Sequence, residues 1–515
     1  MVALPDEIWY HIFAEFEDYM PLKNWRMYGA QAELNHQGPV VLRDLCLVCR
    51  QFQRIAQPLL YRTLLIEGRD GERDIQSMMM RTLIANPKIG EQVRAVSIDD
   101  RTLWWSIQKL STPAFSPDDM TKLFLPALRY LDLPPPLTGR LRHALDRSGF
   151  AALGVAYMPH VQFVDSTIHD DYSPLPWMLS GILGVQEEFP FPSYQPSSTR
   201  ASEGFCNDEG YTEDQEPQNS RIVYPKAFAN YGFPNLTEVR IRTGSSDDGC
   251  TPAWVIEPLL LHPTLKILRT LGINWYGEEL RKLKWPTHVN NNLECLDLTE
   301  AIIDAEGLKT VLIRCQGLRG LSIELPGSRR ESWAGDFEDW EIDYDKFRNI
   351  LLQHGQKLDE FDLHTAEHDA DHSAGDGSLG SLRELTFLRH LKVQKETLLG
   401  PPWGDGPPAL SFSEALPSSI ETLHLYWRES CWISSWADSG RHEYNEEIQE
   451  FLIEDKMPNL RKISMERVHT EEKEYEWSDD LKVEGWDVKI VQERLGERCD
   501  SIGYMRNIVI LTKNI

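Results

Sequence analysis

The hexapeptide LECLDL at residues 293–298 shows a spacing that recurs along this chain: apolar, two variable residues, apolar, one variable residue, apolar. Leu296 and Leu298 alternate with the polar residues Asp297 and Thr299, which is typical of a strand with one buried face. The same spacing begins again at Val93, Leu128, Leu236, Leu268, Leu318, Leu358, Leu388, Ile420 and Leu460. A chain that repeats one strand pattern in this way is expected to build a sheet from similar units.

A helical pattern precedes several of these hexapeptides. The segments are WVIEPLLLHPTL, LKTVLIRCQGL, FRNILLQHGQKL and IQEFLIEDKMPNL, and in each an apolar stripe at helical spacing is followed by Gly or Pro and then by the strand. A helix that ends at a turn residue and leads into one short parallel strand is a right-handed unit. The pattern starts lie about 25 to 40 residues apart over most of the stretch from Leu236 to Leu460, which predicts an α/β fold.

These units resemble leucine-rich repeats. The resemblance implies an irregular solenoid over residues 67–480, with parallel strands on the concave side and helices on the convex side. The asparagine ladder of the family is missing, because Ala301 stands at the corresponding position after LECLDL. The alternative is an ordinary α/β domain with several parallel strands, in which the spacing occurs by chance.

The first residues form a second pattern, LPDEIWYHIFAEF at 4–16 and LRDLCLVCRQFQRIAQPLLYRTLLI at 42–66. Pro5 presets the backbone of a first helical turn, and the acids after it complement the positive end of the helix. Ile8, Ile12 and Phe13 then share one stripe, and the second segment repeats apolar residues at three- and four-residue steps. Short amphipathic helices cannot bury all their apolar residues alone, so this unit needs a partner or a large domain behind it.

This unit resembles the F-box, and the chain as a whole resembles fungal-type F-box proteins with leucine-rich repeats. The resemblance implies docking onto the Skp-type linker of SCF ubiquitin ligases through Leu4, Pro5, Ile8, Ile12, Phe13, Leu45, Val48, Cys49 and Phe52. The family usually has a short loop between the segments at 4–16 and 42–66, whereas this chain has an insertion there, residues 17–41. The alternative is a helical cap on the repeat domain that has no partner.

Three domains follow. Residues 1–66 are the F-box-like unit with its insertion at 17–41, residues 67–480 are the repeat domain, and residues 481–515 are expected to cap the open end with strand and helix pieces. The segment 187–220 is rich in Pro, Ser, Gly and acidic residues, with few aliphatic ones. It cannot bury enough apolar surface to order itself, so we expect a flexible acidic loop there.

Composition narrows the classes of partner. The net charge of -27 repels phosphate backbones and anionic membranes, which argues against nucleic-acid and membrane binding. Eight cysteines in 515 residues do not form a dense disulfide framework. No signal-peptide pattern and no long apolar run is present, so the expected location is the cytoplasm or the nucleus.

Catalytic motifs are weak. The GxGxxG string at 375–380 follows an acidic histidine-rich segment instead of leading from a strand, which argues against dinucleotide binding. Cys46 and Cys49 lack a second ligand pair and are expected to pack. A divalent metal could be held by His364, His368, Asp369, Asp371 and His372. We favour a polar loop for that cluster, and expect neither cofactor nor metal.

Polar residues between the apolar positions of the strands are expected to face a protein or peptide target. The candidates for target contact are Arg240, Arg242, Asp297, Glu324, Asp362, His390, Lys392, His424 and Tyr426. Together with these candidates, the resemblance to F-box proteins implies a non-catalytic substrate receptor that reaches a cullin through the linker. The alternatives are a scaffold that binds partners without delivering them for ubiquitination, and an enzyme with its site around His364.

Overall fold

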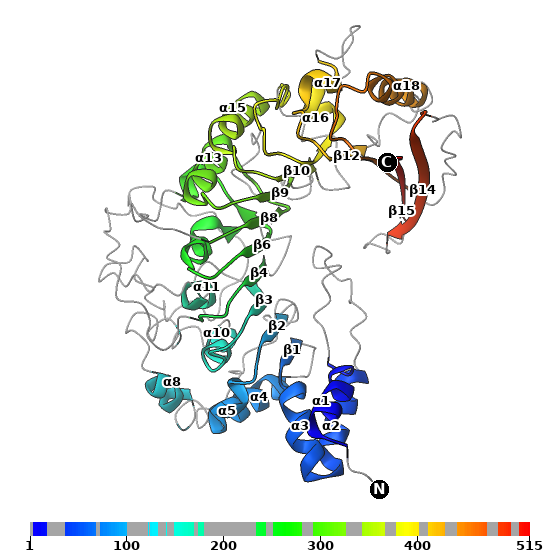
Figure 1. Cartoon of the computed structure of the whole chain (residues 1–515). Coiled ribbons are helices and arrows are strands. Elements are labelled where there is room, and N and C mark those ends of the chain that lie inside the picture. Colours follow the sequence, from blue (N-terminus) through cyan, green and yellow to red (C-terminus); the bar gives the residue numbers. More distant parts are fainter. Residues whose placement is uncertain are drawn as a thin grey trace, which may run out of the picture.

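The computed structural model describes residues 4–17, 37–67, 73–99, 122, 124–131, 141, 149–168, 174–179, 233–243, 251–280, 292–325, 342–365, 377–400, 410–427, 440–470, 483–495 and 504–514. The segment 187–220, most of the insertion at 17–41 and the histidines His368 and His372 lie outside these residues. The expected α/β class is confirmed, because a large and mostly parallel sheet carries helices on one side (Figure 1).

The main sheet has thirteen strands in the order β1-β2-β3-β4-β6-β8-β9-β10-β11-β12-β13-β15-β14. The strands that run parallel are β1 (Thr63–Glu67), β2 (Ala95–Asp99), β3 (Phe163–Ile168), β4 (Glu238–Thr243), β6 (Ile267–Leu271), β8 (Cys295–Thr299), β9 (Gly320–Leu325), β10 (Glu360–Thr365), β11 (His390–Gln394), β12 (Thr422–Trp427) and β13 (Lys462–Thr470). Antiparallel β15 (Tyr504–Lys513) and β14 (Trp486–Leu495) complete the sheet. The short strands β5 (Thr251–Pro252) and β7 (Ile273–Asn274) pair with each other.

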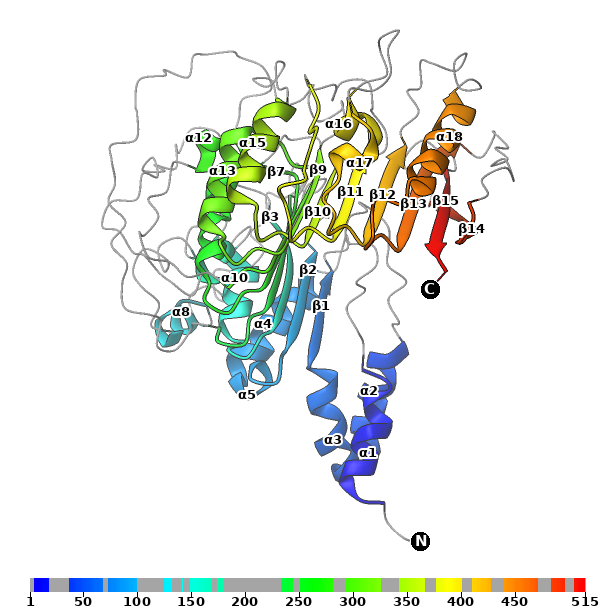
Figure 2. The same cartoon turned by 45° about the horizontal axis from the view of Figure 1, so that its top comes forward.

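Helices follow the outer side of the curved sheet, and the strands line its inner side (Figures 1 and 2). They are α4 (Arg73–Ala85), α5 (Pro87–Gly90), α8 (Leu125–Leu131), α10 (Gly149–Ala156), α11 (Pro174–Leu179), η3 (Ala253–Val255), η4 (Glu257–Leu261), α12 (Gly277–Leu280), α13 (Ala305–Arg314), α15 (Tyr344–His354), α16 (Lys395–Leu399), α17 (Phe412–Ala415) and α18 (Gly440–Ile453). Helices α1 (Asp6–Ala14), α2 (Gln37–Val48) and α3 (Arg50–Leu60) extend beyond β1 at one end of the sheet (Figure 2).

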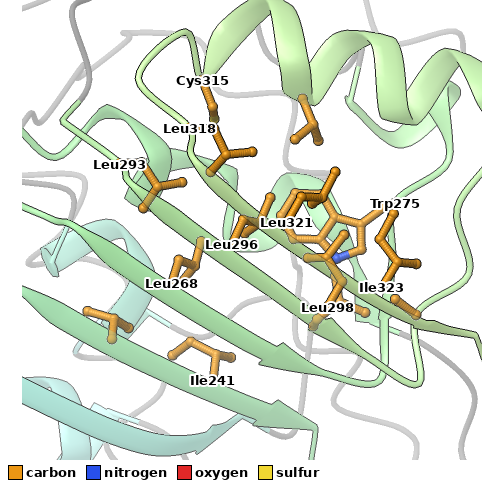
Figure 3. Packing of buried hydrophobic residues seen from close by; sticks show 14 of the residues in the cluster. Ile241, Leu268, Trp275, Leu293, Leu296, Leu298, Cys315, Leu318, Leu321 and Ile323 are labelled. Atoms are coloured by element: carbon orange, nitrogen blue, oxygen red, sulfur yellow. The ribbon is translucent and has the colours of Figure 1, made fainter. Parts of the chain in front are cut away.

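The core lies between the sheet and the outer helices. Leu321 and Ile323 of β9 are buried, and in register they face Phe361 and Leu363 of β10. Figure 3 shows this layer around Trp275, where leucines from successive strands meet the helix side. Strand alternation turns every second side chain toward this layer, so the repeated hexapeptide produces continuous apolar rows.

Polar residues begin the helices of this layer. Asp304 caps α13, because its carboxylate accepts a hydrogen bond from the backbone N–H of Gly307 at 2.7 Å. The same oxygen accepts the N–H of Gly277, the first residue of α12, at 2.9 Å. Asp343 caps α15 by accepting the N–H of Lys346 at 2.9 Å. An aspartate before the apolar stripe thus fixes where each of these helices starts.

Backbone hydrogen bonds also join successive units just before the strands start. The N–H of Glu294 donates to the carbonyl of Lys266 at 2.8 Å, and the N–H of Arg319 donates to Glu294 at 2.8 Å. The same bond recurs from Asp359 to Arg319 and from Arg389 to Asp359. The entry into each strand is therefore held by its predecessor, without the asparagine ladder that the sequence lacks.

Two hexapeptides were assigned wrongly from the sequence. The described part of LRYLDL, residues 128–131, is helical and not a strand, because Leu128 and Leu131 belong to α8. Together with Phe124 just before the helix, they are buried at helical spacing. At Leu268 the pattern starts three residues too late, because Leu268 pairs with Leu296 and therefore holds the middle apolar position. Leu265 is the true start.

Other boundaries differ as well. Strand β3 was missed because its third apolar position is Ser166, and the predicted domain boundary at 66 falls inside β1, which pairs with β2. Helix α2 begins at Gln37, so the last residues of the predicted insertion 17–41 are helical. The segment 486–495, expected as strand or helix pieces, is a strand throughout. Among the described residues, no helix combines the length and the apolar character needed to cross a membrane.

Candidate functional site

Helices α1, α2 and α3 have a core of their own. Its buried members are Phe13, Leu42, Ile55, Ala56 and Leu59, and they form a cluster separate from that of the sheet. The rings of Trp9 and Phe52 pack at 4.7 Å between centroids, and Phe13 meets Phe52 edge-on at 5.0 Å. The three helices are therefore a small packed unit at the end of the sheet.

Polar contacts fix α1 against α3. The side chain of Gln51 donates to the carboxylate of Asp6 at 2.8 Å, and Arg54 forms an ion pair with the same carboxylate. The hydrogen bond from Gln51 and the charge of Arg54 hold the pKa of Asp6 below its usual value. Asp6 is thus both a favourable charge in the first turn of α1 and the attachment of that turn to α3.

Apolar side chains remain exposed on this unit. Ile8 and Ile12 lie one turn apart on α1, with Ile12 42% exposed, and Leu47 and Val48 at the end of α2 are 81% and 64% exposed. We define the opening-helix surface as Leu4, Ile8, Ile12, Phe16, Leu47 and Val48, all of which are exposed. Two groups of large aliphatic side chains in water on one small unit are unusual for a surface without a partner.

The nine residues predicted to bind a linker divide between this surface and the core. Leu4, Pro5, Ile8, Ile12, Val48 and Cys49 are exposed. The other three are not part of the exposed face: Phe13 is buried, and Leu45 and Phe52 pack against the cluster around it. Sequence reasoning missed Leu47. The sequence does indicate that Leu47 is exposed, because it lies off the buried stripe of α2 and has no apolar neighbour one helical turn away.

The inner face of the sheet carries polar rows. The central polar row, defined by strand register from β2 to β13, consists of Ser97, Asp165, Arg240, Arg269, Asp297, Ser322, Asp362, Lys392, His424 and Ser464. These residues alternate with the core-facing residues of the same strands, so they lie on the side away from the helices.

Over β3 to β8 this row is an arginine cluster. Arg269 pairs with Asp297 at 2.9 Å on one side and with Glu238 at 3.3 Å on the other. Arg240 pairs with Glu238 at 2.7 Å and stacks over the ring of Phe163 at 4.6 Å. Each charge therefore has an opposite charge beside it, which is what burial of these groups requires.

Over β9 to β13 the row becomes a histidine cluster around Asp362. One oxygen of Asp362 lies 2.8 Å from Nδ1 of His364 and accepts the hydroxyl of Tyr426 at 3.1 Å. The rings of His364 and Tyr426 stack at 4.2 Å. His424 contacts the hydroxyl of Ser464 at 2.7 Å and a carboxylate oxygen of Glu466 at 3.2 Å.

His364 is held as a cation. Burial taken alone lowers its pKa, but the carboxylates of Asp362 and Glu324 act in the other direction and raise it to about 9. The Nε2 atom of His364 lies 3.5 Å from Glu324, so the ring sits between two carboxylates. A protonated imidazole with two carboxylates and a stacked phenol is a rigid element of the inner face.

The residues predicted for target contact differ in accessibility. Arg240, Asp297, Asp362 and Tyr426 are buried, so they position the rows instead of presenting free groups. Arg242, Glu324, His390, Lys392 and His424 are half-buried. Sequence reasoning missed Arg269, which joins two acidic residues of the row, because the hexapeptide at Leu268 was set three residues too late. Within the described residues, no group of three or more His, Cys, Asp or Glu side chains is arranged to hold a metal ion.

The sequence was also compared with known proteins. Neither the scan against protein-family models nor the search of curated proteins found a match.

Proposed function

We propose that this chain is the substrate receptor of an SCF-type ubiquitin ligase. In this proposal α1, α2 and α3 are an F-box that docks onto a Skp-type linker, and the sheet with its outer helices is an irregular leucine-rich-repeat solenoid that holds a target protein. The observation that carries the proposal is the opening-helix surface, because the unit that bears it has its own core and still exposes large aliphatic side chains.

The chemistry asked of this chain is proximity. A receptor that holds a target beside a ubiquitin-conjugating enzyme converts a bimolecular attack of lysine on a thioester into a nearly intramolecular one. This role requires two surfaces on one rigid body and no catalytic group. The sheet separates the opening-helix surface from the histidine cluster, which leaves both surfaces free to bind at once (Figure 1).

The target surface in this proposal is the inner face over β9 to β13. The side chain of Lys392 in the central polar row is 39% exposed, and it pairs with Glu360 at 2.8 Å. His390 contacts Thr422 at 2.8 Å on the neighbouring strand. Half-buried groups of both signs, fixed in place before binding, suit a protein ligand better than a single small anion.

Substitution in the opening-helix surface tests the proposal. Ile12→Asp places a charge where the linker would pack, and we expect co-purification of the Skp-type linker to fall by roughly 100-fold, as for the loss of an interface hot spot. Ile313→Asp is the matched control, because Ile313 on α13 is 45% exposed and lies on the sheet-bearing part of the chain. Equal linker recovery from the two variants would contradict the docking assignment.

Delivery is tested separately from docking. Affinity capture of the full chain under proteasome inhibition should recover the linker, a cullin and a target together. Loss of the chain should then slow turnover of that target. A target that is bound but turns over at an unchanged rate would assign the chain to the scaffold class instead.

A further inference from the structure

Within the part of the chain that the structure describes, the sheet ends at its C-terminal side in an open edge. Strand β14 is the last in the order and pairs only with β15, and among the described residues no strand lies against its outer side. Figure 1 shows β14 at the end of the molecule opposite α1, α2 and α3. A free edge of this kind offers a row of backbone donors and acceptors to another strand.

Hydrogen bonding defines which residues face that edge. The N–H of Asn514 donates to the carbonyl of Gly485 at 2.8 Å, which makes 485 and 514 a hydrogen-bonded pair of the antiparallel ladder. Bonded pairs recur at every second residue, so the odd-numbered residues of β14 bond β15. Val488 and Ile490 therefore turn their N–H and C=O groups outward. Trp486 turns its C=O outward, while its N–H donates to the carbonyl of Val483 at 3.1 Å.

The side chains of Trp486, Val488 and Ile490 extend the apolar face of the sheet from β15, where it is buried, onto β14. Val488 and Ile490 pair with Leu511 and Val509, which are buried, yet they are themselves 39% and 47% exposed. On the other face of β14, Asp487 and Lys489 are exposed. The edge thus combines open backbone groups, an apolar stripe and two opposite charges.

We propose that this edge binds β14 of a second copy of the same chain, antiparallel and centred on Val488. In that register Asp487 of each copy lies opposite Lys489 of the other, so two ion pairs form by symmetry. Trp486 of each copy lies opposite Ile490, and Val488 faces its own counterpart, so the apolar stripes of the two copies join. The N–H groups of Val488 and Ile490 then donate to the C=O groups of Val488 and Trp486 of the other copy.

The charges select this register against its neighbours. Centring on Lys489 would place that lysine opposite itself, and centring on Ile490 would place Asp487 opposite Glu493. A lysine in an edge strand discourages pairing with unrelated strands. In a second copy, Asp487, two residues away on the same face, lies opposite this lysine and neutralises its charge. We therefore propose a second copy, and not an unrelated extended segment, as the binding partner.

The two copies would share one continuous sheet. Since β1 is the opposite edge, the two opening-helix surfaces would lie at the far ends of the pair. This pairing requires no linker and no target. The proposed function would therefore stand if the dimer did not form, and the dimer proposal would stand if no linker bound.

Sedimentation velocity of the purified full chain over a range of concentrations is the test. We expect a dimer whose association weakens by at least roughly tenfold in Lys489→Asp and in Asp487→Lys, because each change turns two attractive cross-strand pairs into repulsive ones. The double variant with both changes should restore the wild-type association. Lys88→Asp makes the same charge change at an exposed position far from the edge, and it should dimerise like the wild type.

A backbone variant separates loss of the dimer from loss of the fold. Val488→Pro removes an outward N–H that β15 does not use, so the β14–β15 ladder and the thermal midpoint should be retained while the dimer is lost. A wild-type chain that stays monomeric at all concentrations overturns the proposal. So does a dimer that survives Val488→Pro and the single charge reversals, and so does a monomer whose β14 edge instead takes an extended segment of another protein.

Discussion

His364 shows how single residues of the inner face are held. Sequence spacing placed Asp362 and His364 on one face of one strand, which is how they lie. Sequence spacing could not predict the contact between Tyr426 and Asp362, because it depends on the register of β10, β11 and β12. Partners two residues apart follow from strand alternation, whereas partners on other strands depend on registers that no local pattern contains.

The raised pKa of His364 makes stability depend on pH. A folded-state pKa of about 9 against an ordinary 6.5 means that the folded protein keeps the proton more tightly than the unfolded chain. The stabilising contribution is therefore complete below about pH 6.5 and is lost as the pH rises through 9. We expect the free energy of unfolding to fall over this window.

Comparison with His364→Gln isolates this effect. At neutral pH the variant should be less stable by roughly 3 kcal/mol, because Asp362 loses a buried cationic partner. The difference should shrink as the pH approaches and passes 9, since the wild type then loses the same charge. Urea denaturation of both proteins across this range measures it, and a difference that does not change with pH would contradict the assigned role of His364.

At the scale of elements, the opening helices are expected to unfold apart from the sheet. Phe13 lies at the centre of their separate core, so Phe13→Ala should destabilise that unit by roughly 3–5 kcal/mol. Limited proteolysis should then add cuts within α1, α2 and α3, while cleavage in the β1–β13 part stays as in the wild type. Ile12→Asp changes an exposed neighbour and should leave the cleavage pattern as in the wild type. Loss of protection across the whole chain would show that the two cores are one cooperative unit.

The elements also show how far the sequence could be read. The hexapeptide at Leu293 gave β8, and its counterparts from Leu318 to Leu460 gave β9 to β13, because each has apolar residues at all three positions. The pattern failed where a position was polar, as at Ser166 in β3. It also failed where the spacing suited a helix equally well, as in α8, since a step of three residues between Leu128 and Leu131 fits both structures.

For the candidate site, the sequence located the exposed residues of α1 but not the division between surface and core. Phe13 and Ile12 are neighbours in one apolar run, and only the packing of α3 against α1 decides that Phe13 is buried and Ile12 is not. A resemblance to a docking motif identifies the run as a whole. It does not assign each member to the side that meets a partner.

For the whole molecule, chain order and spatial order of the parallel strands coincide from β1 to β13. Each unit then contacts its neighbours in sequence, which is why a local repeat sufficed to predict a large parallel sheet. The two ends of the sheet differ: one carries the opening helices, and the other ends in β14. We propose that the first end binds a linker protein and that the last binds a second copy of the chain.

The proposed function depends on docking of the opening-helix surface onto a Skp-type linker while the sheet remains free. Amide hydrogen exchange of the full chain, with and without purified linker, can localise this contact. We expect added protection in α1 and around Leu47 and Val48, and unchanged exchange in β1 to β13. Protection that leaves α1 and α2 untouched, or no change at all at saturating linker, would contradict the proposed docking.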